Sequence, residues 1–111
     1  NTALGLSALE QATGDDSTAV GYQSGAAITS GTKNVAIGKG ALSTSTTALK
    51  VIAIGDSAMS ACATGNTHEG SIAIGSEALL NLTTGGGNIA IGVDTLKHHR
   101  CKKCGCGFLC F

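Results

Sequence analysis

The sequence predicts an all-β protein built as a stack of about six coils of 16–20 residues, a β-solenoid. One observation is a five-residue motif, of the form Asn/Ser-x-Ala-Ile-Gly with small changes, which recurs six times. Another is its regular spacing, because the motif glycines follow one another after 16, 17, 17, 20 and 17 residues. The third is a composition with 17 Gly and only 3% aromatic residues, which leaves little apolar area for a conventional core.

Each motif is expected to form a short strand that ends at a corner. Its Ala faces one side of the strand and the two residues flanking that Ala face the other, so both sides are apolar and both are expected to be buried. We expect the aliphatic pair, such as Val35 and Ile37, to fill the inside of the coil. The Ala would then face outward, where its small side chain lets a second backbone approach, although the pattern is also compatible with the opposite assignment.

The motif Gly is expected to turn the chain, because only Gly tolerates the dihedral angles or the crowding at such a corner. The residues that define the structural repeat are Ala3, Gly5, Ala19, Gly21, Ala36, Gly38, Ala53, Gly55, Ala73, Gly75, Ala90 and Gly92.

The remainder of each unit is expected to contain a second short strand and two turns. An Ala-Leu pair such as Ala41-Leu42 follows the Gly in most units, and polar turn-forming residues come next. Such a pair could begin a helical turn, as in a leucine-rich repeat, but these units are shorter and lack the leucine pattern of that family. The second unit has Ser24-Gly25 in place of the pair, which predicts a local irregularity there.

The 20-residue unit carries three extra residues, which we expect in the loop around residues 66–70. His68-Glu69 in this loop could be a pair of ligands, but a polar loop tip is the favoured interpretation.

Charge divides the chain into two parts. Residues 1–96 carry three basic and seven acidic side chains, whereas residues 97–111 carry four basic and no acidic ones. We therefore predict a β-roll repeat domain over residues 1–96 and a Cys/His-rich basic cap over residues 97–111.

Nucleic acid is not expected as a partner, because no aromatic residues interleave with the basic ones for base stacking. No apolar stretch approaches ~18 residues, so membrane insertion is not expected either. The chain opens on a repeat without Met, so we expect it to be a fragment or a processed product of a longer protein.

The repeat motif, together with the following Ala-Leu pair, resembles the head repeat of YadA-like trimeric autotransporter adhesins, which also occurs in phage and viral tail-fibre proteins. The resemblance rests on six copies in phase over residues 1–96. It implies a left-handed parallel β-roll that assembles as a tight homotrimer and serves adhesion or host recognition. It also implies an extracellular location, on a virion tail fibre or a cell surface, with a host-cell receptor or polysaccharide as partner. A trimer that buries its Ala columns around one axis would compensate for the thin core.

The C-terminal segment holds four of the five Cys. A disulfide staple is the favoured interpretation, because extracellular fibres meet oxidising surroundings. One alternative is a zinc or iron site, although the spacing matches no standard zinc finger, and no other cofactor is expected. Free thiols, or a non-native end of the sequence, are the other alternative. The candidate metal ligands are His98, His99, Cys101, Cys104, Cys106 and Cys110. Cys62 stands apart and is expected to be a small buried residue, or a neighbour of its own copies in a trimer.

These observations predict a structural and attachment module rather than an enzyme. Gly55-Asp56-Ser57 has the form of a lipase-like nucleophile block, but the required Asp-x-x-His partner is missing. A metal-stabilised binding tip is one alternative function. A non-adhesive surface solenoid of the ice-binding type is another, but Thr46-Thr47 and Thr83-Thr84 do not form the Thr-x-Thr ladder that it needs.

Overall fold

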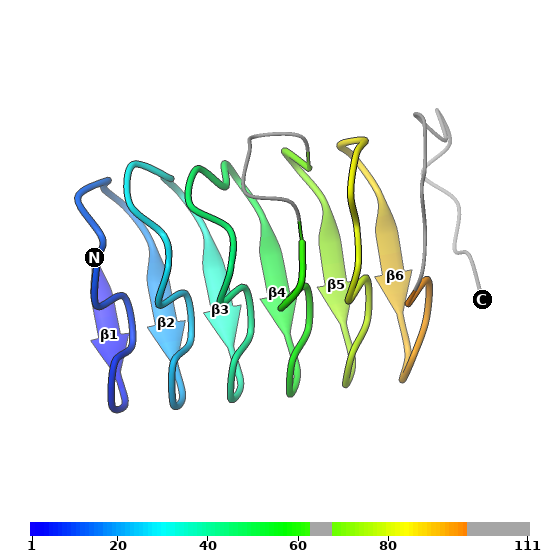
Figure 1. Cartoon of the computed structure of the whole chain (residues 1–111), viewed down its shortest axis with the longest axis horizontal. Helices are drawn as coiled ribbons and strands as arrows, with labels where there is room; N and C mark the ends of the chain where they lie inside the picture. The colour runs from blue at the N-terminus through cyan, green and yellow to red at the C-terminus, as the bar shows by residue number, and fades with distance from the viewer. Residues whose placement is uncertain (63–67, 98–111) are drawn as a thin grey trace.

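The computed structural model describes residues 1–62 and 68–97 of the chain. In this part the protein is all-β, and six three-residue strands lie side by side in one parallel sheet (Figure 1). The strands are β1 (Thr2–Leu4), β2 (Thr18–Val20), β3 (Val35–Ile37), β4 (Ile52–Ile54), β5 (Ile72–Ile74) and β6 (Ile89–Ile91). The described ranges contain no helix long and apolar enough to cross a membrane.

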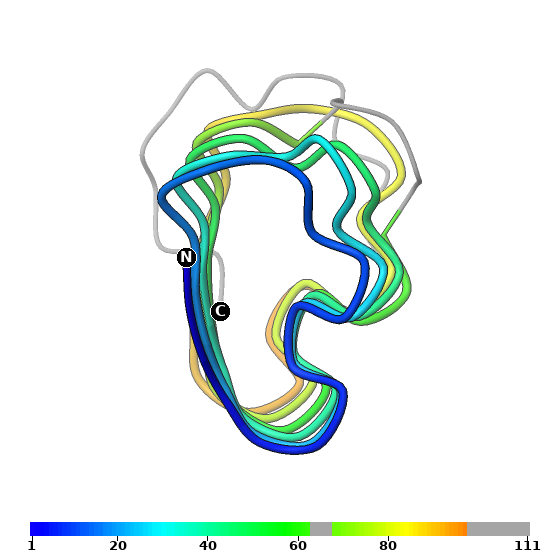
Figure 2. The same cartoon turned by 90° about the vertical axis from the view of Figure 1, so that its left-hand side faces the viewer.

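The sheet follows the order of the chain, and its register follows the repeat. Each motif Ala lies opposite the motif Ala of the next strand, from Ala3 and Ala19 at one end to Ala73 and Ala90 at the other. The chain therefore winds as a β-solenoid of about five turns, which nearly superpose when viewed along the stack (Figure 2). The predicted solenoid and the phase of its six motifs are confirmed. The longest extent of the molecule, 32 Å, is close to the height of six layers at ~4.8 Å.

Each turn of the described chain contains one strand rather than the predicted two. Outside the sheet the only strand-like pairing in these residues is an isolated bridge between Thr32 and Leu49. Two residues after the corner Gly the backbone is left-handed, and it is left-handed again two residues later, as at Ser57 (φ 56°) and Met59 (φ 52°). An alternation of this kind keeps the chain from extending into a second strand. The turns still bond to their neighbours, for example from the amide of Met59 to the carbonyl of Ala78 at 3.0 Å.

The second turn keeps the regular path, so the predicted irregularity at Ser24-Gly25 is wrong. Gly25 has φ 60° and takes the left-handed position that Leu9 and Leu42 occupy in their turns. Its amide donates to the carbonyl of Ala41 at 2.8 Å, as a regular stack requires. Ile28 is fully buried and lies against the place where a side chain of residue 25 would stand.

The prediction that the aliphatic pair fills the coil is also wrong, because the two faces of the sheet are reversed. The motif Ala side chains point inward, and all of them except Ala3 in the open first turn are buried. The flanking side chains, such as Ile52 and Ile54, point outward and are half-exposed. The reason is volume, since a second column of large side chains already fills the interior. Its buried members are Leu9, Leu42, Met59 and Leu79. Inside the solenoid, the Ala column cannot line an axis between chains.

The corner glycines are required by the closeness of the stacked backbones. Their φ angles lie between 126° and 133°, a region that L side chains rarely adopt. A Cβ atom on Gly55 would stand 2.5 Å from the carbonyl carbon and oxygen of Gly75 in the next turn. The prediction that Gly is needed at these corners is confirmed.

Candidate functional site: an outer aliphatic face and a buried histidine

The outward side of the sheet is a continuous apolar strip, which we call the outer aliphatic face. It carries two side chains from each strand, and ten of the twelve are aliphatic. These are Leu4, Val20, Val35, Ile37, Ile52, Ile54, Ile72, Ile74, Ile89 and Ile91, with Thr2 and Thr18 completing the set. No charged residue interrupts the strip.

Exposure along the outer aliphatic face is greatest near its two ends. Leu4 is 68% and Ile91 44% exposed, whereas the outward side chains of β4 and β5 are half-exposed. The residue after each corner Gly borders the strip, and Leu6 and Val93 extend the apolar surface there with exposures of 74% and 70%. Exposed aliphatic surface of this continuity is typical of a contact face.

The inner edge of each strand carries a ladder of polar side chains that the sequence alone did not reveal. The first residue of four motifs, Asn1, Ser17, Asn34 and Ser71, accepts a side-chain hydrogen bond from the amide of its counterpart one turn later. The Oδ1 of Asn1 accepts from Ser17 at 2.9 Å, and the Oδ1 of Asn34 accepts from Val51 at 3.0 Å. The hydroxyl oxygens of Ser17 and Ser71 accept in the same way. Their donors are the backbone amides of Asn34 and Asn88, one turn later. The signal in the sequence was the recurrence of Asn or Ser at this position.

The ladder is interrupted at one place, which is the 20-residue unit. Val51 has no side-chain acceptor to offer, and the amide of Ser71 bonds instead to the carbonyl of His68 at 3.2 Å. His68 is fully buried, so the prediction of a polar loop tip is wrong for this residue. Glu69 is exposed and pairs with Lys50 at 3.0 Å, so the two neighbours do not act together as ligands.

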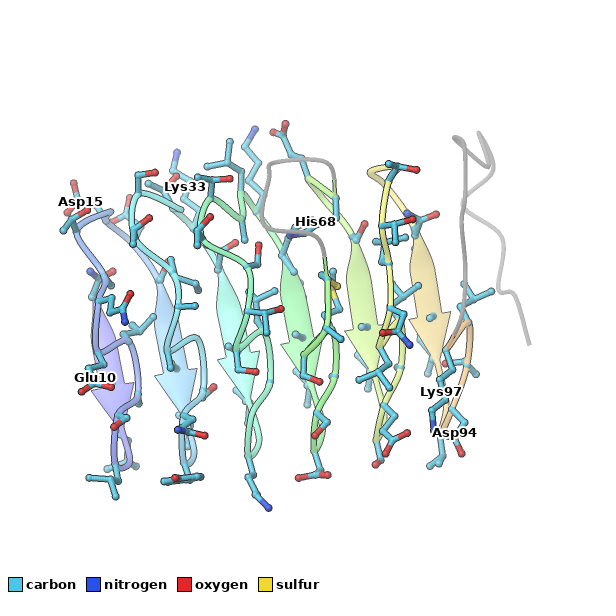
Figure 3. The ribbon with its side chains drawn as sticks, in the orientation of Figure 1. Glu10, Asp15, Lys33, His68, Asp94 and Lys97 are labelled. Carbon is cyan, nitrogen blue, oxygen red and sulfur yellow. The ribbon has the colours of Figure 1, made fainter. Side chains whose placement is uncertain are left out.

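The buried imidazole of His68 lies against the third turn (Figure 3). Its Nε2 is 2.8 Å from the hydroxyl oxygen of Ser45, and its Nδ1 has no hydrogen-bond partner among the described residues. Burial lowers the pKa of His68, because removal from water disfavours the charged ring.

Cys62 is buried as a free thiol, as predicted. It points into the solenoid and donates to the carbonyl of Leu79 at 3.5 Å, so it cannot meet its own copies at an axis between chains. Burial raises the pKa of the Cys62 thiol to about 12. A thiol of this kind is unreactive at neutral pH.

A serine hydroxyl beside a histidine is the pair on which nucleophilic catalysis depends. Here Ser45 and His68 are both fully buried, and no pocket opens among residues 1–62 and 68–97. The hydrolase-like Ser57 is on the surface, 3.5 Å from the Asp56 carboxylate. The contact between Ser45 and His68 is therefore an interior hydrogen bond.

Threonines align along another wall of the solenoid. The hydroxyl of Thr13 donates to the carbonyl of Thr29 at 3.1 Å, and the hydroxyl of Thr29 donates in the same way to Thr46. This is a single column rather than a Thr-x-Thr ladder. Because these hydroxyl protons bond to the next turn, the column does not support an ice-binding surface.

At the last described turn Lys97 pairs with Asp94 at 3.2 Å and also with Glu77. Figure 3 labels Lys97 and Asp94 near the C-terminal end of the stack. Hydrogen bonds raise the pKa of Lys97, and the bond to Glu77 has a larger effect than the bond to Asp94. Within the described part of the chain, no three His, Cys, Asp or Glu side chains gather as a metal site. The predicted ligands His98, His99, Cys101, Cys104, Cys106 and Cys110 lie outside the described residues.

Comparison with known proteins finds no matching family model, no similar curated protein and no similar solved structure.

Proposed function

We propose that the chain is a structural and attachment module, a rigid solenoid segment that assembles as a homotrimer. In this proposal it is part of an extracellular fibre, either a viral tail fibre or a cell-surface adhesin. The turns wind in the left-handed sense, and the assembled fibre contacts a host-cell receptor or a polysaccharide. The outer aliphatic face carries the proposal, because ten aliphatic side chains from consecutive strands stay accessible in the single chain.

The shape of this face favours contact with further copies of the chain. The strip follows the stack for about 24 Å, at ~4.8 Å per strand, but is only two side chains wide. Three such strips can meet around one axis parallel to the stack, which closes the assembly and covers all of them. The aliphatic rows thus take the place in the trimer that the sequence suggested for the Ala column.

The rest of the structure suits a spacer. The strands and corners of the described turns repeat the same inter-turn hydrogen bonds, which favours a segment that is stiff along its length. The described residues contain no pocket, and attachment then uses the surface of the assembled fibre.

Native mass spectrometry with Ile54→Lys tests the assembly. The added charge lies in the middle of the outer aliphatic face, where burial without a partner is costly. We expect the unchanged protein to be a trimer and Ile54→Lys to be a monomer that keeps its β circular dichroism. Thr84→Lys is the matched control, since Thr84 is exposed and outside the strip. A monomeric unchanged protein at micromolar concentration would contradict the proposal.

Attachment is tested separately, by binding of the fluorescently labelled trimer to host cells with and without enzymatic removal of surface polysaccharide. Saturable binding supports the attachment role, and its loss after removal identifies polysaccharide as the partner. Absence of saturable binding would reduce the role to that of a spacer.

A further inference from the structure

The 20-residue unit places an ionisable ring inside a wall that is otherwise built from small side chains. His68 stands seven residues before the next corner Gly, where the other turns have Gly14, Gly31, Ala48 and Gly85. Its ring is fully buried and reaches across to Ser45 in the third turn. We propose that His68 is an acid-sensitive switch, whose protonation expels the ring and opens the solenoid wall around residues 68–71.

The hydrogen bonding of the ring accommodates only the neutral form. A neutral imidazole has one N–H donor and one acceptor, and the Ser45 hydroxyl can serve Nε2 in either role. A protonated imidazole has two donors, and Nδ1 faces no acceptor among the described residues. Protonation therefore leaves a buried charge and a donor without an acceptor, and both are relieved when the ring moves into water.

Among the described residues, no ionised side chain offsets that charge. On the preceding turn, the ionisable residue closest to the position that aligns with His68 is Lys50, which is cationic and exposed. On its own turn they are Cys62, whose thiol is neutral, and Glu69, whose carboxylate is exposed and paired with Lys50. The facing segment of the next turn, residues 85–88, has no ionisable side chain, and neither has the segment 63–67. Burial is the cause of the lowered pKa of His68.

The backbone at His68 ties three turns together, so movement of the ring has a structural consequence. The carbonyl of His68 accepts from Ser71, and the amide of Gly70 donates to Leu49 in the preceding turn at 3.2 Å. The carbonyl of Glu69 accepts from Gly87 in the following turn at 2.9 Å. Since Val51 offers no ladder acceptor here, release of residues 68–71 separates the fourth and fifth turns locally.

The direction of the pH effect follows from the lowered pKa. The closed wall is fully stable above the pKa of a free imidazole, near 6.5, and loses stability as the pH falls toward the folded pKa. Between pH 7.5 and pH 5 the equilibrium constant for opening rises by at most about 30-fold, the limit set by protonation of the open form alone.

Hydrogen exchange of the unchanged protein at pH 7.5 and pH 5, corrected for intrinsic rates, tests the switch. We expect protection of the amides of Gly70, Ser71 and Gly87 to fall by about 10- to 30-fold at pH 5. The amides of Thr18 and Val35, which bond to the next turns at 2.8 Å, should keep their protection. Equal protection at both pH values, or an equal loss in all turns, would overturn the proposal.

Two variants assign the effect to one ring. His68→Gln can still hydrogen-bond to Ser45 but does not titrate, so its exchange near residue 70 should be independent of pH. The double variant His98→Asn/His99→Asn removes the other two histidines and should keep the full effect. If the double variant loses the pH dependence, the switch lies elsewhere. If His68→Gln does not fold, NMR titration of the His68 ring in the unchanged protein decides the question, and a pKa at or above 6.5 contradicts the proposal.

Discussion

The two faces of the same sheet differ in how much the residue type varies from strand to strand. The inward position is Ala in all six strands, whereas the outward positions vary among Thr, Leu, Val and Ile. Inside, the space is fixed by the opposite wall and by the spacing of the backbones, so only a methyl group fits. Outside, any aliphatic residue is accepted, because the single chain places nothing against it. The invariant face therefore builds the solenoid, and the variable face is available for association.

The largest effect is expected where this inner constraint acts on the backbone itself. Gly55→Ala would place Cβ 2.5 Å from the carbonyl group of Gly75, at φ 133°. We expect the free energy of unfolding to fall by roughly 3 kcal/mol or more, measured by guanidinium denaturation.

Gly87→Ala is the matched control for that prediction. Gly87 also has a positive φ, 71°, but a Cβ there would meet nothing within 4 Å. Lys33 and Lys50 occupy the corresponding position in earlier turns with φ 59° and 54°, so a side chain fits there. A loss near 1 kcal/mol is expected. Equal losses at the two positions would show that φ alone, and not the close stacking, requires the glycines.

A smaller effect is expected from added volume on the two faces. Ala73→Val adds two methyl groups inside the solenoid, where Ala73 is fully buried, and should lower the free energy of unfolding by about 1–3 kcal/mol. Val20→Ile adds one methylene outside, at a position where the next four strands already carry Ile, and should change it by less than about 0.5 kcal/mol. The comparison fails if Val20→Ile is the more damaging of the two.

The last prediction concerns the reactivity of the Cys62 thiol, and its test disturbs the fold least. Its raised pKa, about 12, and its burial keep the thiol protonated at pH 8. Gln11→Cys, on the exposed side of the wall, should react with iodoacetamide at least ~100-fold faster, as followed by peptide mass spectrometry. Comparable rates would mean that the interior opens freely to water.

The sequence was sufficient for the solenoid, the register and the corner glycines, because all three follow from the repeat itself. It did not assign the faces, since a strand that is apolar on both sides has no polar side to mark the exterior. Two features of the repeat do distinguish the faces. Leu42 and Leu79 recur opposite the strands and fill the interior, and an invariant Ala beside variable neighbours indicates a position short of space.

The prediction for His68 fails for a different reason. Its polar neighbours in the sequence favour a loop tip, but the three extra residues of the unit lie earlier than predicted. Counting back from the strand aligns His68-Glu69-Gly70 with Gly85-Gly86-Gly87, so the extra residues precede His68. That alignment places His68 on the wall, although no pattern in the sequence shows that its ring turns inward to reach Ser45.

Because each motif Ala pairs with the motif Ala of the next strand, the length of the solenoid is set by its number of units. Because every strand meets the next without slippage, a duplication or deletion of one whole unit between two corner glycines, such as residues 39–55, leaves all other contacts in place. The length of the segment then changes in increments of one strand spacing, ~4.8 Å. A gene that gains or loses such units can therefore change the length of the solenoid in equal steps, without redesigning the protein.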